Sequence, residues 1–373
     1  MIIGVPKEVK THEYRVGLTP TSVRELVAHK HQVVVETNAG AGIGAPDAAY
    51  EKAGARIGDP WKEGELIVKV KEPQREERKK ITDRHVLFTY LHLAPDREQT
   101  EDLMKSGAIC IAYETVTARG GGLPLLAPMS EVAGRMSVQV GASCLEKERG
   151  GMGILLGGVP GVPPAKITIL GAGVSGSSAA RMAVGSGARV YVLDRSLDVL
   201  RKIEAEFGAR AVTVHSSRDT VEQHVLSADL VIGAVLVPGA AAPKLVTRQM
   251  VKAMKPGSVV VDIAIDQGGC FETSRPTTHS APTYEVDSVI HYCVANMPGA
   301  VPVTSTYALT NATLPYVLTL ADDGVADAIE VKAGLRPGVN IAHGAVTHPA
   351  VAEALGLKFT PIDEVLNLAP HTA

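Results

Sequence analysis

Short apolar runs alternate with longer segments of mixed apolar and polar residues, beginning at the first residues of the chain. A short apolar run is typical of a buried strand, and the mixed segments have the length of helices. The strands expected in the first third are Ile2–Val5, Val33–Glu36, Leu66–Val70, Val86–Tyr90 and Ala108–Ala112. The helices expected between them are Thr21–Lys30, Asp47–Ala53 and Asp96–Lys105. This alternation predicts a parallel, doubly wound α/β sheet.

A second alternating block follows a helix expected over Met129–Lys147, with Ser130 as its N-cap, and a loop rich in glycine and proline at residues 150–164. Its expected strands are Ile167–Leu170, Arg189–Leu193, Ala211–Val214, Leu230–Gly233, Ser258–Ile263 and one near His291–Cys293. The block ends around Met297–Gly299. The last ~75 residues, with a helix expected over Leu309–Gly324, are too few for a comfortable third core.

We therefore expect two doubly wound parallel-sheet domains linked by helices. Residues 1–128 and 304–373 form a discontinuous domain, and residues 129–303 form a domain inserted into it. Two α/β domains of this kind place a cleft at the carboxyl ends of their strands, where ligands usually bind. Titratable residues at those strand ends are therefore the first candidates for chemistry.

The strongest motif follows the strand Ile167–Leu170, where the chain continues as Gly171-Ala172-Gly173-Val174-Ser175-Gly176 and then as a helix from Ser177 to Val184. In a Rossmann βαβ unit, Gly171 permits the tight turn, Gly173 lets the backbone approach a pyrophosphate, and Gly176 lets the helix pack on the strand. The helix N-terminus supplies free N–H groups to the phosphates. The alternative is an ordinary glycine-rich turn.

Asp194 ends the next strand, 23 residues after Gly171. A carboxylate at that position accepts hydrogen bonds from the ribose hydroxyls and repels a 2′-phosphate. The motif therefore predicts NAD rather than NADP, although the neighbouring Arg195 leaves room for some tolerance of a phosphate.

Composition narrows the function further. The net charge of −3 over 373 residues gives no electrostatic case for nucleic acid or for a membrane surface as partner. No apolar run approaches the ~20 residues that span a bilayer, and the chain starts without a basic and apolar leader, so we expect a cytoplasmic protein. Its four cysteines are far apart and are expected as free thiols, and the histidines lack the spacing of a metal site, so no metal is expected.

Four titratable residues lie at expected strand ends or in adjoining loops: Arg15, Lys71, His92 and Asp266. Each also has a structural interpretation. Arg15 and Lys71 can be solvated surface cations, and Lys69 is an equally good candidate for the inward-facing lysine. His92 lies between two leucines, as a hydrogen-bonded core histidine would. Asp266 precedes two glycines, as a turn residue would.

The chain resembles the alanine dehydrogenase family nearly end to end. The segments that carry the resemblance are Gly4–Glu8 with Arg15, Lys69–Pro73, Phe88–Ala94, Pro128–Arg135, Asp262–Gly269 and Val294–Pro302. The NAD-binding part of proton-translocating transhydrogenase belongs to the same superfamily. His92 in Leu-His-Leu-Ala and Asp266 in Ile-Asp-Gln-Gly-Gly favour the amino-acid dehydrogenase branch.

The resemblance implies that L-alanine, NAD⁺ and water give pyruvate, ammonium and NADH. It implies that Arg15 and Lys71 hold the substrate carboxylate, that His92 is the acid/base, and that Asp266 positions water or ammonia. It also implies a homo-oligomer, commonly a hexamer. The implied cofactor contacts, besides the glycines, are Ser130, Val174, Ser175, Asp194, Ser216, Val235, Leu236, Asn296 and Met297.

Two other functions remain open from the sequence. One is a transhydrogenase-like subunit that passes hydride between nicotinamides, and the other is a non-catalytic NAD-binding module. The first needs no clamp for an amino-acid carboxylate, and the second leaves Arg15, Lys71, His92 and Asp266 without a role.

Overall fold

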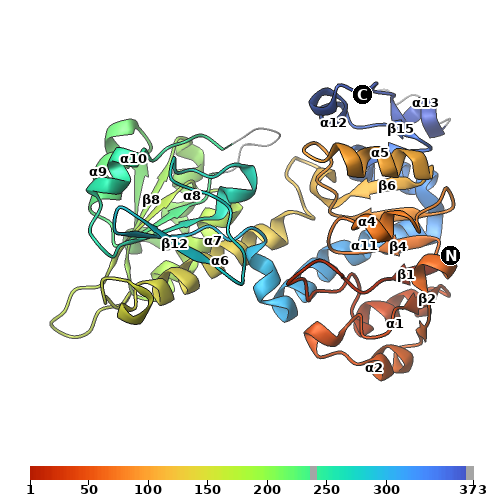
Figure 1. The fold of residues 1–373 in the computed structure, drawn as a ribbon, viewed down its shortest axis with the longest axis horizontal. Helices are drawn as coiled ribbons and strands as arrows, with labels where there is room; N and C mark the ends of the chain where they lie inside the picture. The colour runs from red at the N-terminus through yellow and green to blue at the C-terminus, as the bar shows by residue number, and fades with distance from the viewer. Residues whose placement is uncertain (236–241, 367–373) are drawn as a thin grey trace. The chain divides into compact units, whose positions relative to one another are not determined.

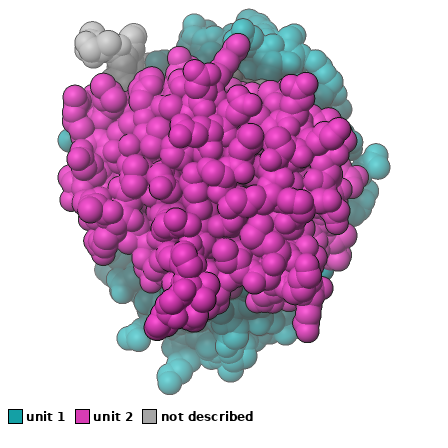
Figure 2. Space-filling model, turned by 90° about the vertical axis from the view of Figure 1, so that its left-hand side faces the viewer, with its two compact units in different colours: residues 1–129, 299–373 teal, residues 130–298 magenta. Residues whose placement is uncertain are grey.

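The structure is a computed structural model that describes residues 1–235 and 242–366 (Figure 1). The chain divides into two compact units, which Figure 2 colours separately. Unit 1 comprises Met1–Met129 and Gly299–Ala373, and unit 2 comprises Ser130–Pro298. The second junction precedes the long helix α11 (Pro302–Val331), whereas the boundary expected from the sequence falls within that helix. The first junction, between Met129 and Ser130, falls inside the helix Ala127–Cys144 and lies one residue from the boundary expected there.

The sheet of unit 1 has the strand order β15-β14-β6-β5-β4-β1-β2-β3. Its parallel strands are β1 (Ile2–Val5), β2 (Gln32–Val35), β3 (Arg56–Ile57), β4 (Leu66–Val68), β5 (Val86–Thr89) and β6 (Ile109–Ala112). Two antiparallel strands extend it beyond β6, namely β14 (Val339–Ala342) and β15 (Ala345–Val346). Besides α11, the α-helices are α1 (Pro20–Ala28), α2 (Asp47–Lys52), α3 (Pro60–Glu63), α4 (Arg75–Arg78), α5 (Arg97–Ser106), α12 (Pro349–Leu355) and α13 (Ile362–Leu366).

The sheet of unit 2 has the order β12-β13-β11-β10-β7-β8-β9. Its parallel strands are β7 (Lys166–Leu170), β8 (Arg189–Asp194), β9 (Ala211–His215), β10 (Leu230–Gly233), β11 (Val259–Asp262) and β13 (Val289–Tyr292), and β12 (Thr283–Val286) is antiparallel. The α-helices are α6 (Ala127–Cys144), α7 (Val174–Gly185), α8 (Leu197–Phe207), α9 (Arg218–Leu226) and α10 (Arg248–Ala253).

The α/β fold expected from the sequence is confirmed, with the difference that each sheet is mixed rather than wholly parallel. In both sheets the parallel strands follow the doubly wound order, with the direction of winding reversing between β1 and β4 and between β7 and β10. Central strands such as β4 and β10 are buried throughout, as expected for strands covered on both faces. The carboxyl ends of the strands beside each reversal are where ligands bind in such sheets.

Helix starts follow local chemistry, with one correction. Asp96 caps α5 by accepting a hydrogen bond from the Gln99 N–H at 2.9 Å, so this helix begins one residue after the expected start at Asp96. Ser130, expected as an N-cap, instead lies inside α6, which begins at Ala127. Proline is tolerated in the first turn of a helix, so Pro128 does not prevent the earlier start. Among the described residues, no helix is long and apolar enough to cross a membrane.

Candidate functional site

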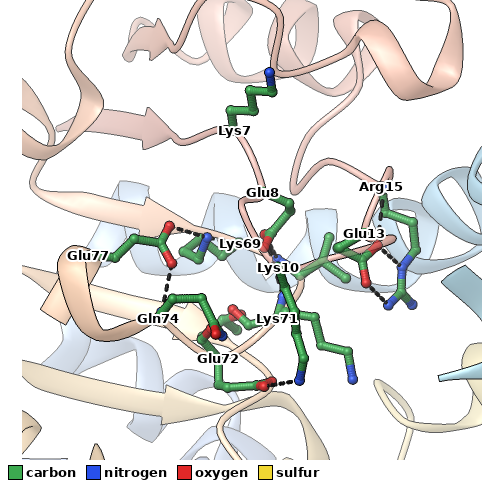
Figure 3. A network of polar contacts seen from close by, with 12 residues as sticks. Lys7, Glu8, Lys10, Glu13, Arg15, Lys69, Lys71, Glu72, Gln74 and Glu77 are labelled. Atoms are coloured by element: carbon green, nitrogen blue, oxygen red, sulfur yellow. Dashed lines mark hydrogen bonds and ion pairs between the residues drawn. The ribbon is translucent and has the colours of Figure 1, made fainter. Parts of the chain in front are cut away.

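In unit 1, the reversal point of the sheet brings together the chain leaving β1 and the chain leaving β4. The two strands pair in parallel, with Ile3 opposite Leu66 and Gly4 opposite Ile67. The segment after β1 packs directly on the end of β4, because a Cβ at Gly17 would lie 2.3 Å from the carbonyl oxygen of Val68. Arg15 and Lys71 therefore lie in segments that meet at one edge of the sheet (Figure 3).

Arg15 is a buried cation held by a buried acid. Its Nε and Nη2 each donate to a carboxylate oxygen of Glu13 at 2.6 Å, and its Nη1 lies 3.0 Å from the sulfur of Met129. Burial alone would lower the pKa of Arg15, but the hydrogen bonds and charge of Glu13 outweigh that effect and raise it. The interpretation of Arg15 as a solvated surface cation is therefore wrong.

The structure also distinguishes the two lysines that the sequence could not. Lys69 is fully buried, with Nζ 3.1 Å from Glu8 Oε2 and 2.7 Å from Glu77 Oε1. Lys71 is only partly buried, and its ammonium lies near Glu72, which also pairs with Lys10 (Figure 3). Burial would raise the pKa of Glu72, but Lys71 and Lys10 together lower it. Lys71 is thus the lysine on the accessible side.

His92 follows β5, the neighbour of β4, and its side chain is half exposed between the buried Leu91 and Leu93. Its φ of +50° places the backbone in the left-handed region, and Glu114 accepts hydrogen bonds from its N–H at 2.6 Å and from the Leu91 N–H at 3.2 Å. Glu114 Oε1 also lies 3.9 Å from His92 Nδ1. The interpretation of His92 as a core histidine is therefore wrong.

Further contacts connect these groups. Tyr90 stacks on His92 with ring planes 5° apart and centroids 5.9 Å apart, and its hydroxyl is electrostatically coupled to Arg15. Thr89 donates to the carbonyl oxygen of Lys71 at 3.0 Å. Unit 1 therefore gathers Arg15, Lys71 and His92 at the carboxyl ends of its central strands.

In unit 2, the glycine motif has the geometry that a dinucleotide requires. Gly171 has φ +92°, which other residues rarely adopt. A Cβ at Gly176 would lie 1.9 Å from the carbonyl oxygen of Gly171, so the helix packs on the loop only with glycine there. A Cβ at Gly173 would meet nothing within 4 Å, so that side of the loop is open. These residues fit a bound pyrophosphate at the N-terminus of α7.

Asp194 is fixed beside this loop. Its Oδ2 accepts from the Ala172 N–H at 2.8 Å, and its Oδ1 accepts from the Ser196 N–H at 2.8 Å. Each carboxylate oxygen keeps further lone pairs, so the group fits a ribose diol. A carboxylate at this place does not fit a phosphate.

The other expected cofactor contacts are distributed around the same edge of the sheet. Val174 and Ser175 form the first turn of α7, and Val235 packs against Gly171 after β10. The N–H of Ser216 donates to the carbonyl oxygen of Asp194 at 2.9 Å. Three further expected contacts lie away from the glycine loop. Ser130 is in α6, and Asn296 and Met297 follow β13. In the sheet, β13 is separated from β7 by β11 and β10. Leu236 lies outside the described residues.

Asp266 is exposed in the short 3-10 helix Ile263–Gln267 that follows β11. The turn after it is held from beneath by the buried Asp262, which accepts from the Cys270 N–H at 2.8 Å and from the Ser274 hydroxyl at 2.5 Å. Burial raises the pKa of Asp262, although these hydrogen bonds oppose the shift. Asp266 belongs to unit 2, whereas the other three candidates belong to unit 1.

Sequence reasoning missed the acids that hold the candidates in place: Glu8, Glu13, Glu114 and Asp262. One signal was available for Glu114, because it follows the expected strand Ala108–Ala112 and so lies at the same edge as His92. Over the described ranges, no group of three or more His, Cys, Asp or Glu side chains is arranged to hold a metal ion.

Comparison with known proteins decides the family. The model of the alanine dehydrogenase/PNT N-terminal domain matches residues 4–133, and that of the C-terminal domain matches residues 137–349. The chain belongs to the alanine dehydrogenase/PNT family. It is an oxidoreductase whose second unit is of the type that binds a pyridine nucleotide.

Within the alanine dehydrogenase/PNT family, the chain is similar to curated alanine dehydrogenases over nearly its whole length. It is 59% identical to that of Halomonas elongata, covering 96% of this chain and 98% of that one, and 54% identical to that of Bacillus subtilis, covering 98% of each. A solved L-alanine dehydrogenase superposes with a TM-score of 0.93 at 52% identity, and the match covers 95% of this chain and 99% of that one. A solved transhydrogenase from Sinorhizobium meliloti superposes with a TM-score of 0.81 at 28% identity, and the match covers 94% of this chain and 100% of that one.

Proposed function

We propose that this chain is an NAD-dependent L-alanine dehydrogenase, which converts L-alanine, NAD⁺ and water reversibly to pyruvate, ammonium, NADH and a proton. The observation that carries the proposal is the grouping of Arg15, Lys71 and His92 at the carboxyl edge of one sheet. It occurs in a chain 52–59% identical to alanine dehydrogenases, with a dinucleotide loop on its second sheet. A transhydrogenase has no use for a carboxylate clamp, and the likeness to one is far lower.

Arg15 and Lys71 neutralise the carboxylate of alanine or pyruvate. Glu13 fixes the orientation of the guanidinium, so that little side-chain entropy is lost on binding. The ammonium of Lys71, in the segment after β4, supplies a second point charge. Two fixed cations orient a small substrate that has few other groups to recognise.

His92 exchanges the protons that the reaction moves on the substrate's nitrogen and oxygen atoms. Glu114 holds its backbone in the left-handed conformation, and its Oε1 lies 3.9 Å from Nδ1 of the imidazole. Asp266 stabilises positive charge on the substrate's nitrogen and positions water or ammonia. A bound nicotinamide supplies the acceptor for the hydride that leaves the α-carbon of alanine.

The same proposal includes the finer properties of the enzyme. The cofactor is NAD rather than NADP, supported by the fixed carboxylate of Asp194. The cofactor contacts are Ser130, Gly171, Gly173, Val174, Ser175, Gly176, Asp194, Ser216, Val235, Leu236, Asn296 and Met297. The enzyme is a homohexamer. It works in the cytoplasm, where its four free, buried cysteines stay reduced.

The test is NADH formation with L-alanine in wild type and in His92→Ala and Asp266→Asn. Each substitution should lower kcat by about 10²-fold or more, because it removes an acid–base or electrostatic group. NADH should still bind, since the Gly171–Gly176 loop is untouched. Near-normal kcat in folded variants would remove both residues from the mechanism, and absence of alanine-dependent NADH formation in wild type would refute the function.

The chain offers a matched control for the first variant. His343 is exposed and has φ +47°, close to the +50° of His92, so alanine at either position incurs the same kind of backbone strain. His343→Ala should retain wild-type kcat. A similar loss in both variants would assign the effect to strain rather than to proton transfer.

A further inference from the structure

Beneath the proposed carboxylate clamp lies an ion cluster that the mechanism does not use. It consists of the Lys69 ammonium between the carboxylates of Glu8 and Glu77, with side chains exposed by 0%, 2% and 6% (Figure 3). Burying charges costs free energy that only close pairing and complete hydrogen bonding offset, so such a cluster is a poor source of stability alone. Its geometry indicates another role.

Glu8 and Glu77 contact the same ammonium but different stretches of backbone. The second oxygen of Glu8 accepts from the Val70 N–H at 2.7 Å and from the Lys71 N–H at 3.4 Å. The second oxygen of Glu77 accepts from the Gln74 N–H at 2.7 Å, at the start of its own helix α4. Of these two glutamates, therefore, Glu8 is the one that joins the two elements carrying the clamp.

Those two elements are the segment after β1, which contains Glu8 and leads to Arg15, and the segment after β4, which contains Lys71. The backbone N–H of Lys71 is bound to Glu8, so the start of that side chain is fixed relative to the Arg15 segment. The Lys10–Glu72 ion pair joins the same two elements nearer the surface (Figure 3). Both carboxylates raise the pKa of Lys69 against the effect of burial, so the ammonium stays charged.

We propose that Glu8 is a positioning residue for substrate binding: by joining the Arg15 segment to the Val70–Lys71 backbone, it sets the separation of the two cations that receive the substrate's carboxylate. The inference rests on the proposed function. It assigns the affinity for pyruvate and alanine in part to a residue that touches neither.

The test compares Glu8→Gln with Glu77→Gln. Each glutamate accepts from the Lys69 ammonium with one oxygen and from backbone with the other. Glutamine has one acceptor oxygen and one donor NH₂, so each variant places an NH₂ against a donor and creates the same conflict. The two variants differ in which backbone is displaced, that of Val70 and Lys71 or that of Gln74.

Glu8→Gln should raise KM for pyruvate about tenfold, the effect of weakening one charge-assisted hydrogen bond, with KM for NADH unchanged. Glu77→Gln should leave KM for pyruvate within about threefold of wild type, within the range of ordinary context effects, while losing a similar amount of thermal stability. Removing a negative charge near the clamp would by itself strengthen the binding of an anion. A raised KM in Glu8→Gln therefore separates positioning from electrostatics.

Equal effects of the two variants on KM for pyruvate, or no effect of Glu8→Gln, would overturn the inference. If Glu8→Gln does not fold, Glu8→Asp keeps the charge and shortens the reach to the Val70 N–H. Its KM for pyruvate should rise, and an unchanged value would also overturn the inference. Lys71→Ala separates this result from the proposed function: a normal KM for pyruvate there would refute the clamp itself.

Discussion

Lys69 and Lys71 show how much of a residue's role depends on partners that are distant in sequence. The two lysines are two positions apart, which along a strand would place them on the same face. β4 ends at Val68, however, and beyond it Lys69 turns into the interior while Lys71 reaches the accessible side. Glu8, which makes the burial of Lys69 tolerable, lies 61 residues away. A single sequence therefore identifies the pair of lysines but cannot assign their roles.

We expect cofactor choice to depend mainly on one residue, Asp194. Its carboxylate is held by the N–H groups of Ala172 and Ser196, so it cannot turn away from an added 2′-phosphate, and like charges at such range cost several kcal/mol when partly desolvated. We expect kcat/KM for NAD⁺ to exceed that for NADP⁺ by about 10²-fold or more. Asp194→Ala should narrow this ratio. It should also weaken NAD⁺ binding, because the loop loses an acceptor.

Steady-state kinetics with both cofactors check this expectation. Asp198→Ala is the matched control, because Asp198 lies four residues further along, in the first turn of α8, and is exposed and paired with Arg201. It removes the same charge without touching the loop, so the cofactor ratio should stay that of wild type. Comparable kcat/KM for NAD⁺ and NADP⁺ in the wild-type enzyme would contradict the role given to Asp194.

At the scale of elements, strands buried on both faces could be predicted well and edge strands could not. β4, β10 and β11 can be recognised in the sequence as apolar runs, because both faces of each strand are covered. β12 alternates between exposed and partly exposed positions, and it belongs to the sheet through its antiparallel pairing with β13. β14 likewise depends on β6, which is distant in the sequence, so no local pattern marks it.

The β7–loop–α7 element makes the clearest distinction between structural and binding glycines. A Cβ at Gly176 would lie 1.9 Å from the Gly171 carbonyl oxygen, so Gly176→Ala must displace the helix from the loop. We expect a lower thermal unfolding temperature and loss of NADH binding. Gly173 has φ −65° and open space around it, so Gly173→Ala should unfold at the wild-type temperature. Its KM for NADH should still rise about tenfold or more, because the new methyl group occupies the approach of the pyrophosphate.

Thermal unfolding and NADH titration of the two variants, side by side, check this pair of expectations. Wild-type NADH affinity in Gly173→Ala would mean that the pyrophosphate does not approach this face of the loop. Wild-type stability in Gly176→Ala would mean that the helix can shift without cost. The two results are independent, since a Cβ at Gly176 would clash with backbone atoms, whereas a Cβ at Gly173 would meet only the bound ligand.

For the whole molecule, the sequence predicted two α/β units because the alternating pattern stops at a glycine- and proline-rich segment and then resumes. It also predicted that the chain returns to the first unit, since the last segment is too short for a core of its own. Both sheets then repeat one winding order, and each reversal point carries its own candidate chemistry. Of the acids that position this chemistry, Glu114 had a signal in its place after an expected strand, whereas Glu8, Glu13 and Asp262 could not be predicted because their partners are set by the fold.

One exposed segment bears on how whole molecules assemble. The 150–164 segment exposes three large apolar side chains, Leu155, Val159 and Val162, by 65%, 54% and 57%. Where exposed apolar side chains form one patch they are typical of a protein–protein contact, so this segment is our candidate contact surface. We expect light scattering on the purified enzyme to give a native mass six times the 39.1 kDa of the protomer. Acidic substitutions at Leu155 and Val162 together should lower that mass, whereas Val331→Asp, equally exposed but in unit 1, should not. A wild-type mass of one protomer at micromolar concentration would refute the hexamer.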